Sequence, residues 1–104
     1  MSEKVIFLEE AKAELINIVD YYEQIYSGLG LDFEQEIKKV LDLIVEFPDI
    51  CSVLKDGTKR MSTHRFPYQI IFYPSGTILW VIAVAHHKRF PAYWENRLKS
   101  ELKT

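Results

Sequence analysis

The spacing of apolar residues changes halfway along this chain, and that change constrains the fold more than any other feature. From residue 8 to residue 47, apolar side chains recur every three or four positions, as they do in amphipathic helices. After residue 58 they gather in short runs that are rich in β-branched and aromatic residues, as in strands. A helical first half and a β-rich second half predict the α+β class, with helices covering one face of a sheet.

The first half predicts one short strand and two helices. The segment EKVIFL, residues 3–8, is a candidate strand, and the acidic pair that follows it suits the first turn of a helix. One apolar stripe runs to a turn made by Gly28 and Gly30, and a second begins at Phe33 and ends before Pro48. Helices joined by so short a turn pack antiparallel, so we expect a helical hairpin.

The second half predicts a β-meander and a closing helix. Candidate strands cover residues 59–64, 68–73 and 77–85, with the turn PSG between the last two. The last strand reads TILWVIAVA, and its nearly continuous apolar character predicts a central or doubly covered position. Pro91 suits the first turn of a helix over about residues 92–102. Together with the first strand, this makes a mainly antiparallel sheet of about four strands.

Length and composition bound the architecture and the location. The 104 residues suffice for one hydrophobic core, so we expect a single domain over residues 1–104. No apolar run approaches the roughly 20 residues that span a bilayer, and the N-terminus lacks the pattern of a signal peptide. Cys51 is the only cysteine, which excludes an internal disulfide and argues against a thiolate metal cluster. We therefore expect a cytoplasmic protein with no membrane association, no cofactor and no metal.

Charge is divided unevenly along the chain. Up to Leu54, four Lys and Arg residues stand against twelve Asp and Glu residues, so this half carries −8. From Lys55 onward nine stand against three, giving +6, and all three histidines lie in this half. The split predicts a basic face suited to nucleic acid or to an acidic protein segment. The alternative is that the acidic helices simply solvate one side of the fold.

One stretch near the end of the chain collects titratable side chains. It reads AVAHHKRFPAYWENR and covers residues 83–97, where the last strand gives way to the closing helix. His86 and His87 are adjacent at a strand end, so their side chains should point to opposite sides and are poorly placed to chelate one metal ion. Arg60 and Arg65, on the segment that leads into the sheet, are candidates for contact with a partner.

Four segments carry a family resemblance. They are the short first strand, the hairpin segment YYEQIYSGLGLDF with FP at its end, the segment RFPYQIIFY, and the tail ILWVIAVAHHKRFPAYWENR. In this order they resemble the RelE/ParE superfamily of bacterial toxin–antitoxin toxins, and in particular the members called plasmid stabilisation proteins. The resemblance covers nearly the whole chain. It implies a growth-inhibiting toxin of a type II system, neutralised in a hetero-oligomer by a cognate antitoxin whose C-terminal segment wraps the sheet and hairpin.

The resemblance implies one of two activities. RelE-like members cut mRNA in the ribosomal A site, and ParE-like members poison DNA gyrase. In RelE-like nucleases an arginine usually follows the tyrosine of the third strand, whereas this chain has Gln69 after Tyr68. His87 falls where the family's second basic residue lies, and Tyr93 falls where its terminal tyrosine lies. For a metal-independent ribonuclease the tentative catalytic residues are therefore Arg65, His87 and Tyr93.

The glutamine at position 69 favours a binding role over catalysis. Cleavage of RNA by its own 2′-hydroxyl needs a base, an acid and cations that hold the phosphate. Glutamine donates a hydrogen bond but supplies neither a fixed charge nor a bidentate fork. The sequence pI is near 5.9, whereas ribosome-directed proteins are usually basic. We therefore expect inhibition of DNA gyrase, with a ribosome-dependent mRNA endoribonuclease and a non-toxic remnant that only binds an antitoxin as the alternatives.

Four arginines are candidates for contact with the target or the antitoxin, namely Arg60, Arg65, Arg89 and Arg97. Arg97 can equally pair with an acidic residue of the first helix. Of the two aromatic residues that begin the closing helix, Trp94 is expected in the core, whereas the role of Tyr93 stays open. A basic sheet and an apolar hairpin groove suit an acidic, amphipathic antitoxin segment that folds on binding.

Overall fold

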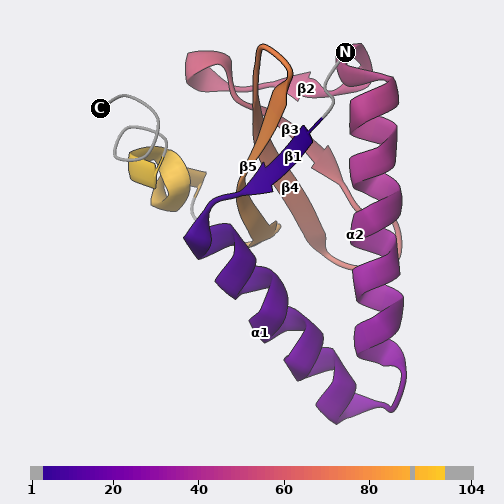
Figure 1. The fold of residues 1–104 in the computed structure, drawn as a ribbon. Helices are drawn as coiled ribbons and strands as arrows, with labels where there is room; N and C mark the ends of the chain where they lie inside the picture. The colour runs from indigo at the N-terminus through magenta and orange to yellow at the C-terminus, as the bar shows by residue number, and fades with distance from the viewer. Residues whose placement is uncertain (1–3, 90, 98–104) are drawn as a thin grey trace.

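The computed structural model describes residues 4–89 and 91–97, and its elements follow the predicted order (Figure 1). Strand β1 covers Lys4–Phe7, helix α1 covers Glu9–Ile25 and helix α2 covers Leu29–Glu46. Strands β2, β3, β4 and β5 cover Ser52–Val53, Lys59–Ser62, Tyr68–Ser75 and Ile78–His86. Short 3-10 helices η1, η2 and η3 lie at Pro48–Ile50, Lys55–Gly57 and Pro91–Trp94.

The strands form one sheet with the order β1-β5-β4-β3-β2, which confirms the predicted α+β class. β1 runs parallel to β5, and the other neighbours are antiparallel. β5 therefore has a strand on each side, and this position explains its nearly continuous apolar sequence. The sheet has five strands where about four were expected. The added strand, β2, is only two residues long, too short to leave a periodic signal.

The turn between α1 and α2 is held by a side-chain cap. Gly28 takes a φ of 92°, in the left-handed region that favours glycine. The carboxylate of Glu23 accepts hydrogen bonds from Gly28 N at 3.0 Å and from Gly30 N at 3.1 Å. A Cβ added at Gly30 would lie 2.6 Å from the carbonyl oxygen of Val19, so glycine lets the two helices approach closely. Because of this cap, α2 begins at Leu29, four residues before the predicted start.

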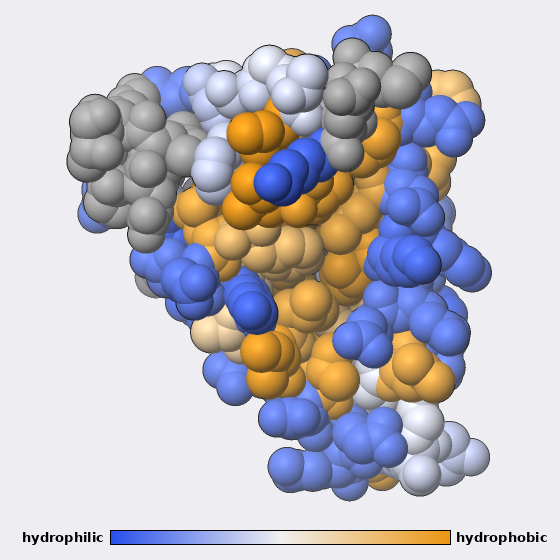
Figure 2. Space-filling view, viewed as in Figure 1, coloured by the Kyte–Doolittle hydropathy of each residue, from blue (hydrophilic) through white to orange (hydrophobic). Residues whose placement is uncertain are grey.

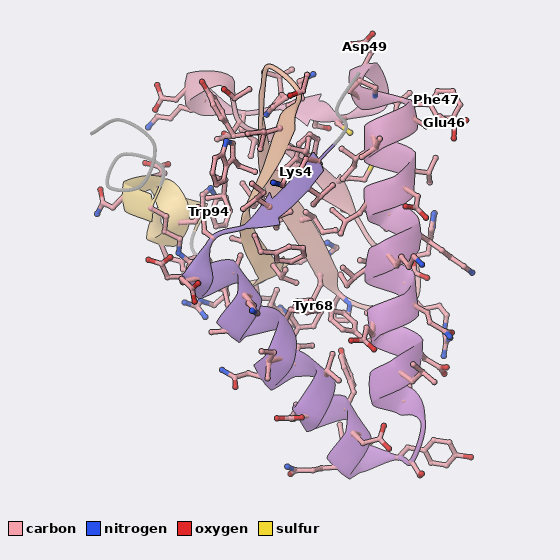
Figure 3. All side chains as sticks on the ribbon, viewed as in Figure 1. Lys4, Glu46, Phe47, Asp49, Tyr68 and Trp94 are labelled. Atoms are coloured by element: carbon pink, nitrogen blue, oxygen red, sulfur yellow. The ribbon has the colours of Figure 1, made fainter. Side chains whose placement is uncertain are left out.

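The core lies between the helical hairpin and the sheet. Aromatic rings connect the two layers: Tyr22 of α1 and Phe33 of α2 pack against Phe66 and Tyr68, with ring centroids 4.9 to 6.3 Å apart. Figure 3 shows Tyr68 in the wedge between the two long helices. Burial of such side chains supplies most of the driving force for folding. The largest fully buried side chains are those of Phe33, Phe72, Ile44, Ile70, Ile71, Leu79, Ile82, Val40, Val81 and Val84.

The closing segment begins where it was predicted. The 3-10 helix η3 starts at Pro91 and is followed by helical backbone at residues 95–97. Trp94 is buried in the core, as expected, and lies beside the sheet in Figure 3. The rest of the predicted helix, residues 98–102, lies outside the described residues.

Candidate functional site

Glu14 forms the centre of a polar cluster where α1 meets the end of β5. Its Oε2 accepts hydrogen bonds from Arg97 Nη2 at 2.8 Å and from the Tyr93 hydroxyl at 2.9 Å. Its Oε1 accepts from Arg97 Nη1 at 2.9 Å and from Val84 N at 3.1 Å. The side chains of Arg97 and Glu14 are only 14% and 19% exposed. A bidentate pair this well shielded from solvent is stronger than an ordinary surface ion pair.

This ion pair also completes the edge of the sheet. β1 ends at Phe7, opposite Val81, and leaves the outer edge of β5 without a neighbouring strand from there on. On that edge, the carbonyl oxygen of Ile82 accepts a hydrogen bond from Arg97 Nη1 at 3.0 Å, and Val84 N donates to the carboxylate described above. The pair thus satisfies backbone groups that a longer β1 would otherwise bond.

Tyr93 is enclosed by charged side chains. The guanidinium carbons of Arg89 and Arg97 lie 3.9 and 4.9 Å from the centroid of its ring. Burial, followed by the charge of Glu14 and the hydrogen bond to it, raises the pKa of Tyr93 to about 12. The hydroxyl therefore keeps its proton at neutral pH and already donates it to a carboxylate, which leaves it poorly placed to exchange a proton with a substrate.

The two adjacent histidines lie on opposite faces of the sheet. The ring of His86 packs edge-on against Tyr68, with centroids 5.1 Å apart, on the face covered by the helices. The ring of His87 lies on the other face, where its Nε2 is 3.4 Å from Ser62 Oγ. This separation agrees with the alternation expected for neighbouring residues at a strand end.

A shallow polar depression on the open face contains His87. The volume of this depression is about 380 Å³. Ser62 of β3 pairs with Gln69 of β4, and this register brings both side chains to the face that the helices do not cover. Gln69 is buried at the base of this region, in the position where the resemblance implies an arginine. The lining residues are Ile50, Ser52, Arg60, Met61, Ser62, Gln69 and His87.

A second depression lies beside α1, on the helix-covered face. Its volume is about 220 Å³. It contains Tyr93 and Arg89 from the closing segment together with His86 from the end of β5. The remaining lining residues are Glu14, Asn17, Ile18, Tyr68 and Val84.

The structure does not bring the three tentative catalytic residues together. His87 lies in the open-face depression, whereas Tyr93 lies in the depression beside α1. Arg65 lies in the loop between β3 and β4, where it forms a salt bridge of 3.4 Å with Asp32 and stacks on the ring of Phe66 at 5.2 Å.

The four candidate binding arginines lie in three places. Arg60 lines the open-face depression, Arg89 lines the depression beside α1, and Arg65 lies in its loop. Arg97 forms the ion pair with Glu14, which agrees with the expected alternative that it pairs with an acidic residue of the first helix. Arg89 and Arg97 therefore lie close together, since both stack on the ring of Tyr93, whereas Arg60 and Arg65 lie elsewhere on the surface.

Glu14 is the site residue that sequence reasoning missed. It lies three positions after Ala11 and four before Ile18, both of which belong to the apolar stripe of α1. A carboxylate at that spacing must point toward the sheet, where it requires a cationic or donor partner. This is the signal that could have identified it.

An apolar groove lies on another side of α1. Figure 2 shows apolar side chains in the hollow between the two long helices and β1. The part of this hollow next to β1 has a volume of about 440 Å³. Its lining residues are Val5, Ile6, Phe7, Glu9, Lys12 and Leu15.

Neither a metal-ligand cluster nor a membrane-spanning helix is found in the described part of the chain. Within residues 4–89 and 91–97, no group of three or more His, Cys, Asp or Glu side chains is arranged to hold a metal ion. Within the same ranges, no helix is long and apolar enough to cross a membrane.

Comparison with solved structures assigns the class of fold. The chain is similar to a protein described as the chromosomal ParDE TA system from P. aeruginosa, with a TM-score of 0.70 and 17% sequence identity. The match covers 83% of this chain and 96% of that chain. The first strand, packed helices, mixed sheet and closing segment therefore form a ParE-like α+β fold.

Comparison with family models then identifies the family. Residues 5–91 match the model described as the ParE toxin of the type II toxin-antitoxin system, parDE. The chain belongs to this family, and the protein is a ParE toxin of a type II toxin-antitoxin system. The comparison with curated proteins gives no match.

Proposed function

We propose that this toxin stops growth by binding a protein target, DNA gyrase, and not by cutting RNA. The observation that carries the proposal is the separation of the tentative catalytic residues: Arg65, His87 and Tyr93 lie in three different places. Tyr93 is also engaged by Glu14, and Gln69 supplies no fixed charge. Phosphoryl chemistry needs its acid, base and cations around one atom, so this arrangement supports a binding function.

The partner that neutralises the toxin is a cognate ParD-type antitoxin, and the apolar groove is its binding site. The groove offers apolar side chains from β1 and α1, including Phe7 and Leu15. Lys12 lines it, and Lys4 stands on β1 beside it (Figure 3). Apolar side chains flanked by lysines suit an amphipathic, acidic segment that folds as it binds.

A supercoiling assay tests the target. Purified gyrase is given relaxed plasmid, ATP and increasing amounts of the toxin, with the toxin–antitoxin complex as the matched control. We expect the free toxin to abolish supercoiling and the complex to leave it intact. Unchanged supercoiling at a large molar excess of active toxin contradicts the proposal.

The second candidate is a ribosome-dependent endoribonuclease, and one observation favours it. The open-face depression contains an arginine, a hydroxyl and an imidazole, from Arg60, Ser62 and His87. Pulse labelling after induction separates the two functions. An early fall in thymidine incorporation supports gyrase as the target, whereas an early fall in amino-acid incorporation, lost in His87→Ala, supports RNA cleavage. Harmless expression with antitoxin binding retained identifies a remnant.

A further inference from the structure

We infer that one side of α1 is the surface that docks the toxin's protein target, separate from the groove that receives the antitoxin. This surface, called the α1 stripe, consists of Ile18, Tyr21, Ile25, Tyr68, His86 and Arg89. The inference rests on the proposed function, because it requires a protein target. The partner that fits the stripe has an apolar pocket for Tyr21 and Ile25 and a carboxylate for Arg89.

The spacing along α1 creates a continuous row of side chains. Glu14, Ile18, Tyr21 and Ile25 are separated by four, three and four residues, which places them on one side of the helix. At the outer end of this row the apolar side chains are not covered by the rest of the fold: Tyr21 is 59% exposed and Ile25 is 58% exposed. Neighbouring exposed apolar side chains mark interaction surfaces more often than isolated ones do.

Aromatic contacts join this row to the end of the sheet. The ring of Tyr21 packs against Tyr22 at 5.3 Å, and Tyr22 in turn lies 6.3 Å from Tyr68. Tyr68 lines the depression beside α1 together with Ile18, and this depression continues to the end of β5. Tyrosine and arginine are enriched among the residues that dominate binding energy at interfaces, so the composition of the stripe is that of a binding surface.

The inner end of the stripe is cationic. Lys88 and Arg89 follow the end of β5, and the carboxylate of Glu14 is already used by its own partners. Arg89 stacks on the ring of Tyr93, and no salt bridge within residues 4–89 and 91–97 involves it. An acidic side chain of the target therefore completes the charge at this end.

The stripe and the antitoxin groove lie on different sides of α1. Lys12, which lines the groove, is nine residues from Tyr21, and nine steps of 100° carry the chain half a turn around the helix axis. Binding of the target and binding of the antitoxin are therefore separable by mutation.

The experiment compares two variants of the stripe with two matched controls. The stripe variants are Tyr21→Ala combined with Ile25→Ala, and Arg89→Glu. The controls are Val53→Ala, which truncates a side chain that is 70% exposed on β2, and Lys39→Glu, an exposed charge reversal on α2. Each protein is assayed for growth inhibition, for inhibition of gyrase supercoiling, for antitoxin binding by titration, and for folding by circular dichroism.

We expect the stripe variants to require at least about tenfold more protein for the same inhibition, as truncation of interface hot spots does. Their antitoxin affinity should stay within about twofold of wild type, and both controls should match wild type in every assay.

Four outcomes can be distinguished, and three of them overturn the inference. If folded stripe variants inhibit as well as wild type, the stripe is not the docking surface and the gyrase proposal stands. If they lose antitoxin binding together with inhibition, the stripe belongs to the antitoxin interface. If wild-type toxin stops growth but leaves supercoiling unchanged, the gyrase proposal fails, and the growth assay of the variants still decides on the stripe. If the wild-type protein neither stops growth nor inhibits supercoiling, both the gyrase proposal and the inference about the stripe fail.

Discussion

Replacement of Glu14 by alanine should destabilise this protein more than substitution of any exposed residue on α1 does. The change leaves the guanidinium of Arg97, which is 14% exposed, without its acidic partner. It also removes the acceptor for the Tyr93 hydroxyl and for Val84 N. All three groups are held in place by the surrounding packing, so water cannot fully replace the lost carboxylate.

The magnitude follows from how much of the pair is shielded. Removing one partner of a fully buried ion pair costs about 3–5 kcal/mol, and removing one from a surface pair costs about 0–1 kcal/mol. The pair in this protein lies nearer the buried limit, so we expect Glu14→Ala to lower the free energy of unfolding by about 2–4 kcal/mol. For a domain of this size, that lowers the melting temperature by roughly 10–25 °C.

A double-mutant cycle measured by urea denaturation tests the reasoning. The variants are Glu14→Ala, Arg97→Met and the two combined, with Asp20→Ala as an exposed control on the same helix. The double variant has no unpaired charge, so its loss should be smaller than the sum of the single losses by about 1–3 kcal/mol. The control should stay within about 0.5 kcal/mol of wild type. A loss below about 1 kcal/mol for Glu14→Ala, or strict additivity in the cycle, refutes the argument.

Three further predictions concern the turn, the alkaline limit and the thiol. Gly28→Asn should destabilise the protein less than Gly28→Ala, because asparagine tolerates a positive φ. Gly30→Ala and Gly30→Asn should each cost about 1–3 kcal/mol, and Gly30→Asn should cost more than Gly30→Ala, because the added atoms meet the carbonyl of Val19. The reverse order in thermal melts at either position counts against the assigned geometry. Burial and Glu14 raise the pKa of Tyr93 from 10.0 to about 12. The contribution of Tyr93 to stability is therefore complete below pH 10 and is lost as the pH rises from 10 to 12. Tyr93→Phe should flatten this decline, and thermal melts in which the variant shows the same decline as wild type contradict the assignment. Burial raises the pKa of the Cys51 thiol, so a thiol reagent should label Cys51 slowly in the native protein and rapidly in urea. Equal labelling rates under the two conditions exclude a buried thiol.

Local patterns predicted most of the fold. Helical spacing identified α1 and α2, and short apolar runs identified β3, β4 and β5, because both signals come from residues that are neighbours in sequence. β2 escaped prediction because two residues carry no period. The early start of α2 was also missed, because it depends on the cap that Glu23 provides from the preceding helix.

The grouping of site residues was not predictable from the same patterns. The sequence indicated that His86 and His87 point apart, since alternation at a strand end is a local property. It did not indicate that Tyr93 and His87 lie in separate depressions. That separation depends on where the closing segment packs, and packing is decided by distant residues.

The sequence by itself therefore determined the class of fold and the order of its main elements, because hydrophobic spacing and turn residues act over short distances. The resemblance of four segments indicated the family. Only the tertiary structure decided which charges meet. Glu14 and Arg97 are 83 residues apart, yet they form a bidentate pair because β1 stops short of the end of β5 and leaves backbone groups that need partners. A hydrogen bond of this kind depends on positions in space, and no local pattern records it.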